Sequence, residues 1–198
     1  MSTVSTILTT QSGLPAMVYR ISVDEYDRMV AHGVLNDPRV ELLNGFLVRK
    51  VSKKPPHVIA TKRLVKSMER IVPPGWHISK EDPVRIPDWD EPEPDLAIVA
   101  GAPEDYQARH PGPEDIALLV EVAETTLDRD QGEKLMAYSA GGIATYWIVN
   151  LVDDRIEVYT QPSQHGYITR RDYTRGEDIP VVIGDVEHGR LAVSDILP

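Results

Sequence analysis

The chain has 198 residues, a formal net charge of −10 and no cysteine. This length suits one domain with a single core, and the absence of cysteine excludes disulfides and thiolate metal sites. No apolar stretch approaches the roughly 20 residues that a membrane-spanning helix needs. The acidic balance argues against nonspecific coating of nucleic acid. These features favour a cytoplasmic protein that does not enter the membrane.

The charge is distributed unevenly along the chain. The segment from Arg49 to Lys80 holds nine of the 21 Lys and Arg residues but only one of the 31 Asp and Glu residues. Such a segment is either a solvated basic face on an acidic protein or a surface that faces phosphate groups. The charge pattern alone does not choose between these two interpretations.

The N-terminal part of the chain predicts a tail, a helix and a hairpin. Residues 1–18 are rich in Ser and Thr and lack the basic start of a signal peptide, so we expect a flexible tail, with residues 19–198 forming one domain. Ser22 and Glu25 form a capping box, which predicts a helix to about Ala31. Asn44-Gly45 between two apolar runs predicts a β-hairpin over residues 40–48.

A basic helix is predicted after Pro55-Pro56, from about His57 to Val72. At about 100° per residue, its apolar side chains gather on one face. The opposite face carries four cations, Lys62, Arg63, Lys66 and Arg70. His57 stands at the start of this helix, where it can bond locally or contact a phosphate.

The rest of the chain predicts a mixed sheet with one further helix. We expect strands at about 78–86, 96–99, 116–122, 145–149 and 155–160, with shorter ones at 180–183 and 191–193. A helix at about 129–140 separates two of these strands, and Gly141-Gly142 ends it. Residues 161–198 are otherwise polar and typical of turns. This order of elements indicates an α/β or α+β fold.

Two carboxylates stand at the ends of apolar strand segments. Asp95 directly precedes the run 96–99, and Glu121 ends the run 116–120. Carboxylates with a neighbouring backbone carbonyl, here that of Val122, are ligands that Mg²⁺ or Mn²⁺ accepts. Lys134 lies early in the next helix, where a lysine can orient or deprotonate water or offset charge on a phosphate. Tyr138 lies on the same helix face.

An ordinary structural explanation exists for the same residues. Asp95 can cap the turn after Pro94, and Glu121 can pair with Lys134 in a salt bridge. Spacing alone favours this explanation, because many α/β proteins place acids at strand ends.

Several sequence blocks, taken in order, resemble one known family. These are Arg39–Gly45, His57, Glu93–Val99, Leu119–Val122, and the longest pair, Asp130–Tyr138 and Gly142–Asn150. Together they resemble the Uma-two family of predicted bacterial endonucleases, whose last two blocks read D-x-G-E-K-L-x-x-Y and G-V-x-E-Y-W-I-V-D. The resemblance runs from about Tyr19 to the end of the chain.

This resemblance implies a restriction-endonuclease-like core of the PD-(D/E)XK superfamily. Such a core has a mixed central β-sheet flanked by helices, here with an N-terminal β-hairpin and extra C-terminal strands. Asp95 and Glu121 take the roles of the two motif acids. The motif lysine is expected at Ala123, so Lys134 takes its role, and Glu41 supplies a further acid.

The implied activity is hydrolysis of DNA phosphodiester bonds with Mg²⁺ or Mn²⁺ held by Asp95, Glu121 and the Val122 carbonyl. His57, Lys62, Arg63, Lys66 and Arg70 would contact DNA, and Tyr138 would be an accessory residue. A homodimer would suit cleavage of two strands. The alternative is an inactive module of the same fold that binds nucleic acid or a protein, because Glu124 adds negative charge beside the motif. Clustered acids also predict a raised pKa for at least one of Glu41, Asp95 and Glu121.

Overall fold

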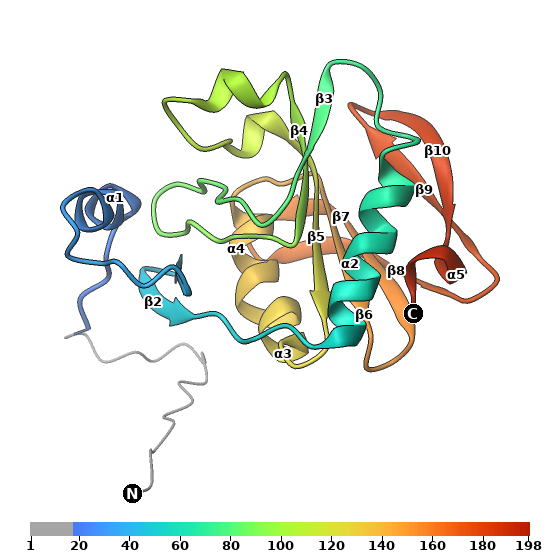
Figure 1. Ribbon diagram of the computed structural model, residues 1–198, viewed down its shortest axis with the longest axis horizontal. Coiled ribbons are helices and arrows are strands. Elements are labelled where there is room, and N and C mark those ends of the chain that lie inside the picture. The colour runs from blue at the N-terminus through green and yellow to red at the C-terminus, as the bar shows by residue number, and fades with distance from the viewer. Residues whose placement is uncertain (1–17) are drawn as a thin grey trace, which may run out of the picture.

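The computed structural model describes residues 18–198, so the tail expected over residues 1–18 lies outside the described residues except for the exposed Val18. A six-stranded sheet forms the centre of the fold (Figure 1). Its order is β3 (Trp76–Ser79), β4 (Leu96–Ala100), β5 (Ile116–Ala123), β6 (Thr145–Asn150), β7 (Arg155–Ser163) and β8 (Gly166–Thr174).

The sheet is mixed because one strand pair is parallel. β5 and β6 run parallel, and every other neighbouring pair in this sheet is antiparallel. A parallel pair needs a long crossover, which here is a helical stretch. It consists of α3 (Leu127–Arg129), the π-helical turn η3 (Asp130–Lys134) and α4 (Leu135–Ala140). The helix predicted at about 129–140 is confirmed and begins two residues earlier.

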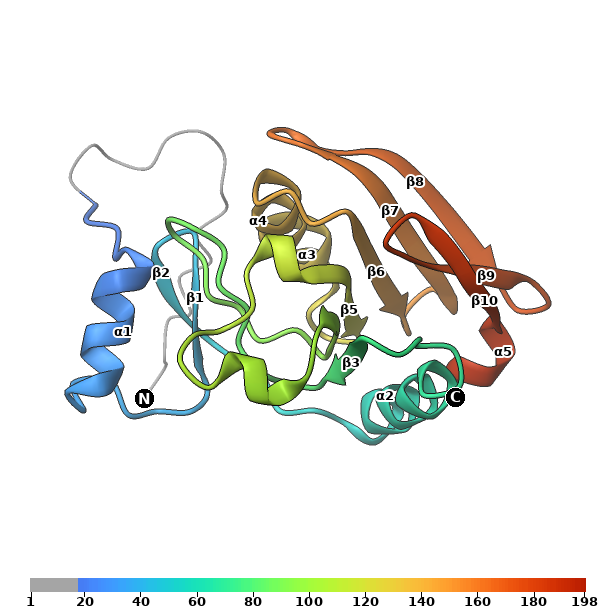
Figure 2. The ribbon, with the colours of Figure 1, turned by 90° about the horizontal axis from the view of Figure 1, so that it is seen from above.

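Two layers cover the two faces of the sheet, as Figure 2 shows for α2 and α4 on opposite sides. One core contains α2 (Pro55–Met68), α5 (Val193–Ile196) and a small sheet of β9 (Asp178–Ile183) and β10 (Val186–Ala192). The other core lies under α4 and the loop that carries Val84 and Ile86. Trp147 packs into the first core and Tyr146 into the second, because successive strand residues point to opposite faces. All eight residues of β5 are buried.

The N-terminal elements lie beside the sheet (Figures 1 and 2). The capping box of Ser22 and Glu25 starts α1 (Val23–Ala31), as predicted. β1 (Val40–Leu43) and β2 (Phe46–Arg49) pair antiparallel across a two-residue turn. Asn44 and Gly45 both have positive φ there, 50° and 76°, which a primed turn requires.

Two predicted boundaries are wrong, and one strand was not predicted. The strand predicted at 78–86 ends at Ser79, because Glu81 has a positive φ and the following segment bonds locally, with Ile86 bridged to Asp90. The helix predicted to Val72 ends at Met68, ahead of Arg70. β8 falls in a region predicted to be rich in turns, because residues 168–172 are exposed and show no buried alternation.

Within the described part of the chain, every helix is too short or too polar to cross a bilayer.

The turn glycine Gly45 provides a test of the hairpin. A Cβ there would lie 2.7 Å from Cβ of Arg20 at φ +76°, whereas Gly33 has φ +68° with nothing within 4 Å. We expect Gly45→Ala to lower the free energy of unfolding by about 2–3 kcal/mol and Gly33→Ala by about 1 kcal/mol. Urea unfolding measures both, and equal losses would contradict the close approach of Arg20.

Candidate active site

The pairing of β4 with β5 brings Asp95 and Glu121 together. The register places Leu96 opposite Val120, so the residue before Leu96 lies opposite the residue after Val120. The Val122 N–H donates to Oδ2 of Asp95 at 2.8 Å, extending this contact. Asp95 and Glu121 are buried, and both line one cavity of about 480 Å³.

Asp95 lies against two basic side chains, Lys53 and His57. Its Oδ1 lies 2.7 Å from Nζ of Lys53 and 3.1 Å from Nε2 of His57. Burial raises the pKa of Asp95, but the His57 hydrogen bond and the charges of His57 and Lys53 outweigh it and lower the pKa to about 2. Asp95 is therefore a carboxylate at neutral pH.

Glu121 is in a different electrostatic state. Its Oε1 accepts from Nζ of Lys134 and from Oη of Tyr138, each at 2.7 Å. Burial raises the pKa of Glu121 to about 8, Lys134 opposes this, and the charges of Asp130 and Asp95 add to it. The predicted raised pKa among the acids is confirmed for Glu121, whereas that of Asp95 moves the other way.

Lys134 lies between two carboxyl groups from separate elements. Its Nζ is 3.6 Å from Oε2 of Glu41, which is 1% exposed on β1. The charges of Glu121 and Glu41 raise the pKa of Lys134 despite its burial. Lys134 therefore remains an ammonium ion, which suits charge stabilisation better than proton abstraction.

The π-helical turn η3 adds an acid that sequence reasoning missed. Asp130 is 2% exposed, lines the cavity and accepts from Oγ1 of Thr126 at 2.6 Å. Burial raises its pKa to about 6, against the charge of Lys134. π-Helical turns are rare and occur often at functional sites. Asp130 is the first residue of the D-x-G-E-K block, and this motif could have identified it as a site residue from the sequence.

Of the five residues predicted to contact DNA, His57 lines the cavity and the other four do not. His57 reaches the cavity as described above, and Tyr138 reaches Glu121. Lys62, Arg63 and Lys66 on α2 and Arg70 just beyond its end are exposed but do not line this cavity. Nη1 of Arg63 donates to the Leu197 carbonyl. The Lys and Arg residues that do line it are Arg39, Lys50, Lys53, Lys54, Arg129 and Lys134.

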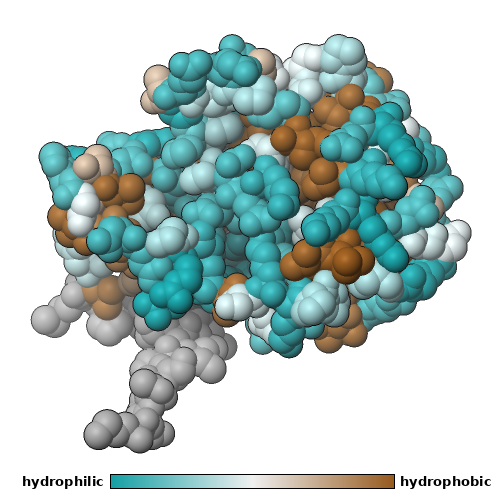
Figure 3. All heavy atoms as spheres, in the orientation of Figure 1, coloured by the Kyte–Doolittle hydropathy of each residue, from teal (hydrophilic) through white to brown (hydrophobic). Residues whose placement is uncertain are grey.

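Hydrophilic side chains cover most of the centre of the face seen in Figure 3.

Glu124, the acid that the sequence adds beside the motif, also lines the cavity. Its Oε1 lies 3.6 Å from Nζ of Lys54, so the negative charge of Glu124 is paired with a lysine.

The donor set around Asp95 and Glu121 fits a magnesium-type ion in part. Mg²⁺ takes one or two protein carboxylates together with waters and a substrate phosphate. Oε2 of Glu121 accepts no hydrogen bond from any described residue, so it can bind a cation once Glu121 releases its proton. Oδ1 of Asp95 contacts Lys53 and His57, whereas Oδ2 accepts only the Val122 N–H and keeps a lone pair for an ion. Among residues 18–198, no group of three or more His, Asp or Glu side chains is arranged as a metal cluster.

Comparison with known proteins identifies a family and a structure of similar fold. A family model described as "Uma2: Putative restriction endonuclease" matches residues 23–192. A crystal structure described as a "putative nuclease belonging to DUF820" from Anabaena variabilis ATCC 29413 has a TM-score of 0.64 and 15% sequence identity. The match covers 89% of this chain and 97% of that chain, and it shows a shared fold. No curated protein matches the chain.

The raised pKa of Glu121 predicts a titration near neutral pH. The folded protein keeps this proton up to about pH 8, whereas an unfolded Glu loses it near pH 4.3. The contribution of Glu121 to stability therefore decreases as pH rises from about 4 to 8. Carboxyl ¹³C NMR should show a Glu resonance titrating near pH 8 that is absent in Glu121→Gln and retained in Glu187→Gln, an exposed control. Burial also raises the pKa of Glu91 to about 7, so its resonance should titrate near that pH and remain in Glu121→Gln. A resonance assigned to Glu121 that titrates below pH 6 would contradict the prediction.

Proposed function

Because the chain belongs to the Uma2 family, whose model is described as "Putative restriction endonuclease", we propose that it is a DNA endonuclease that depends on Mg²⁺ or Mn²⁺ and hydrolyses phosphodiester bonds. The nuclease character rests on the family. The metal, the substrate and the residue roles rest on the cavity.

One observation supports the proposal most strongly. Asp95 and Glu121 lie opposite each other on neighbouring strands, and Nζ of Lys134 is 2.7 Å from Glu121 and 3.6 Å from Glu41. A plain salt bridge between Glu121 and Lys134 does not require Glu41, Asp95 and Asp130 to line the same cavity. Acids that repel one another are costly to bury together, so their convergence favours a site for a cationic or phosphate-bearing ligand.

Each residue of the cavity has a role in this proposal. Asp95, Glu121 and the Val122 carbonyl would hold the divalent ion, which when bound supplies positive charge at the phosphate and lowers the pKa of a bound water. Lys134 stabilises negative charge on the phosphate through its ammonium group. Tyr138 orients Glu121 through the hydrogen bond to Oε1.

The cations suggest a path for the DNA backbone. Lys50, Lys53 and Lys54 line the cavity, and His57 on α2 also lines it. The exposed cations predicted on and after α2 continue away from the cavity along this helix. DNA would cross the cavity and follow α2. A homodimer in the cytoplasm would carry two such sites, one for each strand of the DNA duplex.

An inactive nucleic-acid-binding module is the second candidate. The observation in its favour is the pairing of Asp95 with both Lys53 and His57, which neutralises this carboxylate without a metal ion. In that case the acids and cations of the cavity serve only to stabilise one another.

Plasmid nicking tests the endonuclease directly. We expect the wild type to nick supercoiled DNA with Mn²⁺ or Mg²⁺. Asp95→Asn should abolish nicking, and Lys134→Met should lower the rate at least 100-fold, because loss of a preorganised charge costs about that much. Glu187→Gln serves as an exposed control and should nick as the wild type does.

Metal binding separates the two candidates. Calorimetry should detect Mn²⁺ binding to the wild type and not to Asp95→Asn, and Mn²⁺ should raise the melting temperature of the wild type by mass action. Equal nicking by wild type and Asp95→Asn across linear, supercoiled and single-stranded DNA would refute the proposed site. DNA binding without Mn²⁺ binding would instead favour the inactive module.

Salt dependence tests the role of the α2 cations. Replacing Lys62, Lys66 and Arg70 with Ala should reduce the slope of log K against log salt concentration by about 0.9 for each phosphate that the variant no longer neutralises. Fluorescence anisotropy with labelled duplex DNA measures this slope. Arg190→Ala, an exposed cation outside this helix, is the control. An unchanged slope in the triple variant would make the basic face a solvated surface.

A further inference from the structure

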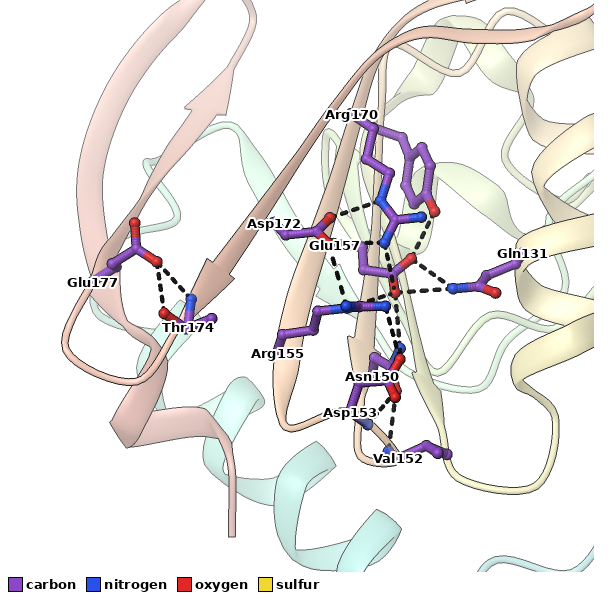
Figure 4. A network of polar contacts seen from close by, with 11 residues as sticks. Gln131, Asn150, Val152, Asp153, Arg155, Glu157, Arg170, Asp172, Thr174 and Glu177 are labelled. Atoms are coloured by element: carbon purple, nitrogen blue, oxygen red, sulfur yellow. Dashed lines mark hydrogen bonds and ion pairs between the residues drawn. The ribbon is translucent and has the colours of Figure 1, made fainter.

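A buried carboxylate outside the cavity is held by an extensive set of hydrogen bonds. Glu157 on β7 is 0% exposed, and Figure 4 shows the polar side chains that converge on it. Its carboxylate oxygens accept from Gln131 at 2.9 Å, Asn150 at 2.8 Å and Tyr159 at 2.6 Å, and two arginines lie within 3.2 Å. Burial raises its pKa, but the hydrogen bonds and the charge of Arg170 lower it overall. Glu157 is thus a fully bonded carboxylate.

The partners of Glu157 come from two different layers. Asn150, Arg155, Tyr159 and Arg170 all belong to β6, β7 and β8, which are neighbours in the sheet. Gln131 is the one partner that comes from the helical crossover. Sheet residues alone reach both carboxylate oxygens of Glu157, so the contact from Gln131 adds a link between the sheet and the crossover.

Gln131 lies in the π-helical turn η3, directly after Asp130 and three residues before Lys134. A π-helical turn departs from the regular pattern of α-helical hydrogen bonds and is rare, so backbone preference alone does not explain it. Side-chain contacts at two successive residues join this turn to the sheet. Oη of Tyr146 donates to the Asp130 carbonyl at 3.1 Å, and Nε2 of Gln131 donates to both oxygens of Glu157.

We propose that Gln131 and Glu157 are positioning residues, which fix the π-helical turn against the sheet and so place Asp130 and Lys134 in the cavity. The catalytic part of this inference rests on the proposed nuclease function. Lys134 must keep its Nζ within 2.7 Å of Glu121, and a turn free to relax to regular α-helix would rotate it away. Glu157 acts through Gln131 and does not line the cavity.

Hydrogen–deuterium exchange tests the positioning without reference to activity. Gln131→Met keeps the length of the side chain and removes the amide donor, so amides of residues 127–136 should exchange at least 10-fold faster. Gln131→Lys restores a donor to Glu157 and should exchange as the wild type does. Arg155→Met removes a sheet-side partner instead and should leave this segment unchanged. Gln131→Asn, whose amide is too short to reach Glu157, replaces Gln131→Met if that variant does not fold.

Steady-state nicking tests the catalytic consequence. We expect Gln131→Met to lower kcat at least 10-fold with unchanged KM, because the DNA-facing cations are not altered, and Gln131→Lys to recover most of the rate. Unchanged exchange in Gln131→Met would overturn the inference whatever the activity. An equal loss of kcat in Arg155→Met would also overturn it, because the network would then act through general stability. An inactive wild type with faster exchange in Gln131→Met would refute the nuclease proposal and leave the positioning role supported.

Discussion

Asp95 and Glu121 are buried opposite each other, and two carboxylates in such a place are stable only if positive groups or protons meet them. The surroundings of the two acids shift their pKa values in opposite directions. Lys53 and His57 hold Asp95 ionised, with a pKa of about 2, whereas burial and neighbouring acids raise the pKa of Glu121 to about 8. Paired titratable groups whose environments separate their pKa values are typical of catalytic sites. The arrangement of the surrounding elements follows from the need to bring these partners to one place.

The groups that surround these two acids come from three separate parts of the chain. Lys53 and His57 come from the start of α2, Glu41 from the β1–β2 hairpin, and Lys134 from the crossover between β5 and β6. The hairpin is therefore part of the site and not only an appendage of the sheet. The crossover carries its lysine on a π-helical turn, and the Gln131–Glu157 contact joins that turn to the sheet. The sheet region provides Asp95 and Glu121, the hairpin and the crossover add Glu41 and Asp130, and Lys53 and Lys134 provide positive charge.

Local sequence signals predicted local structure well. The Ser22–Glu25 capping box and the Asn44-Gly45 turn formed as expected, because a few neighbouring residues determine both. The predicted strand at 78–86 and the missed strand β8 show the limit of such signals. Val84 and Ile86 lie in a loop but are buried, whereas β8 is a largely exposed edge strand held by its pairing with β7. An alternation of apolar and polar residues therefore does not by itself distinguish a strand from a buried loop.

The sequence predicted the family and the mixed sheet, because ordered motifs and apolar strand segments are visible along one chain. It also gave Glu41, Asp95, Glu121 and Lys134 as candidate site residues; the structure places them around one cavity, and their roles stay a prediction. Which cations meet those acids depended on the folded arrangement. The exposed cations of α2 formed the clearest charge pattern, yet Lys53 is the lysine that reaches Asp95. Asp130 and Glu157 also acquired their surroundings through contacts between distant segments. Such contacts depend on where the chain crosses the sheet, and no local periodicity records that.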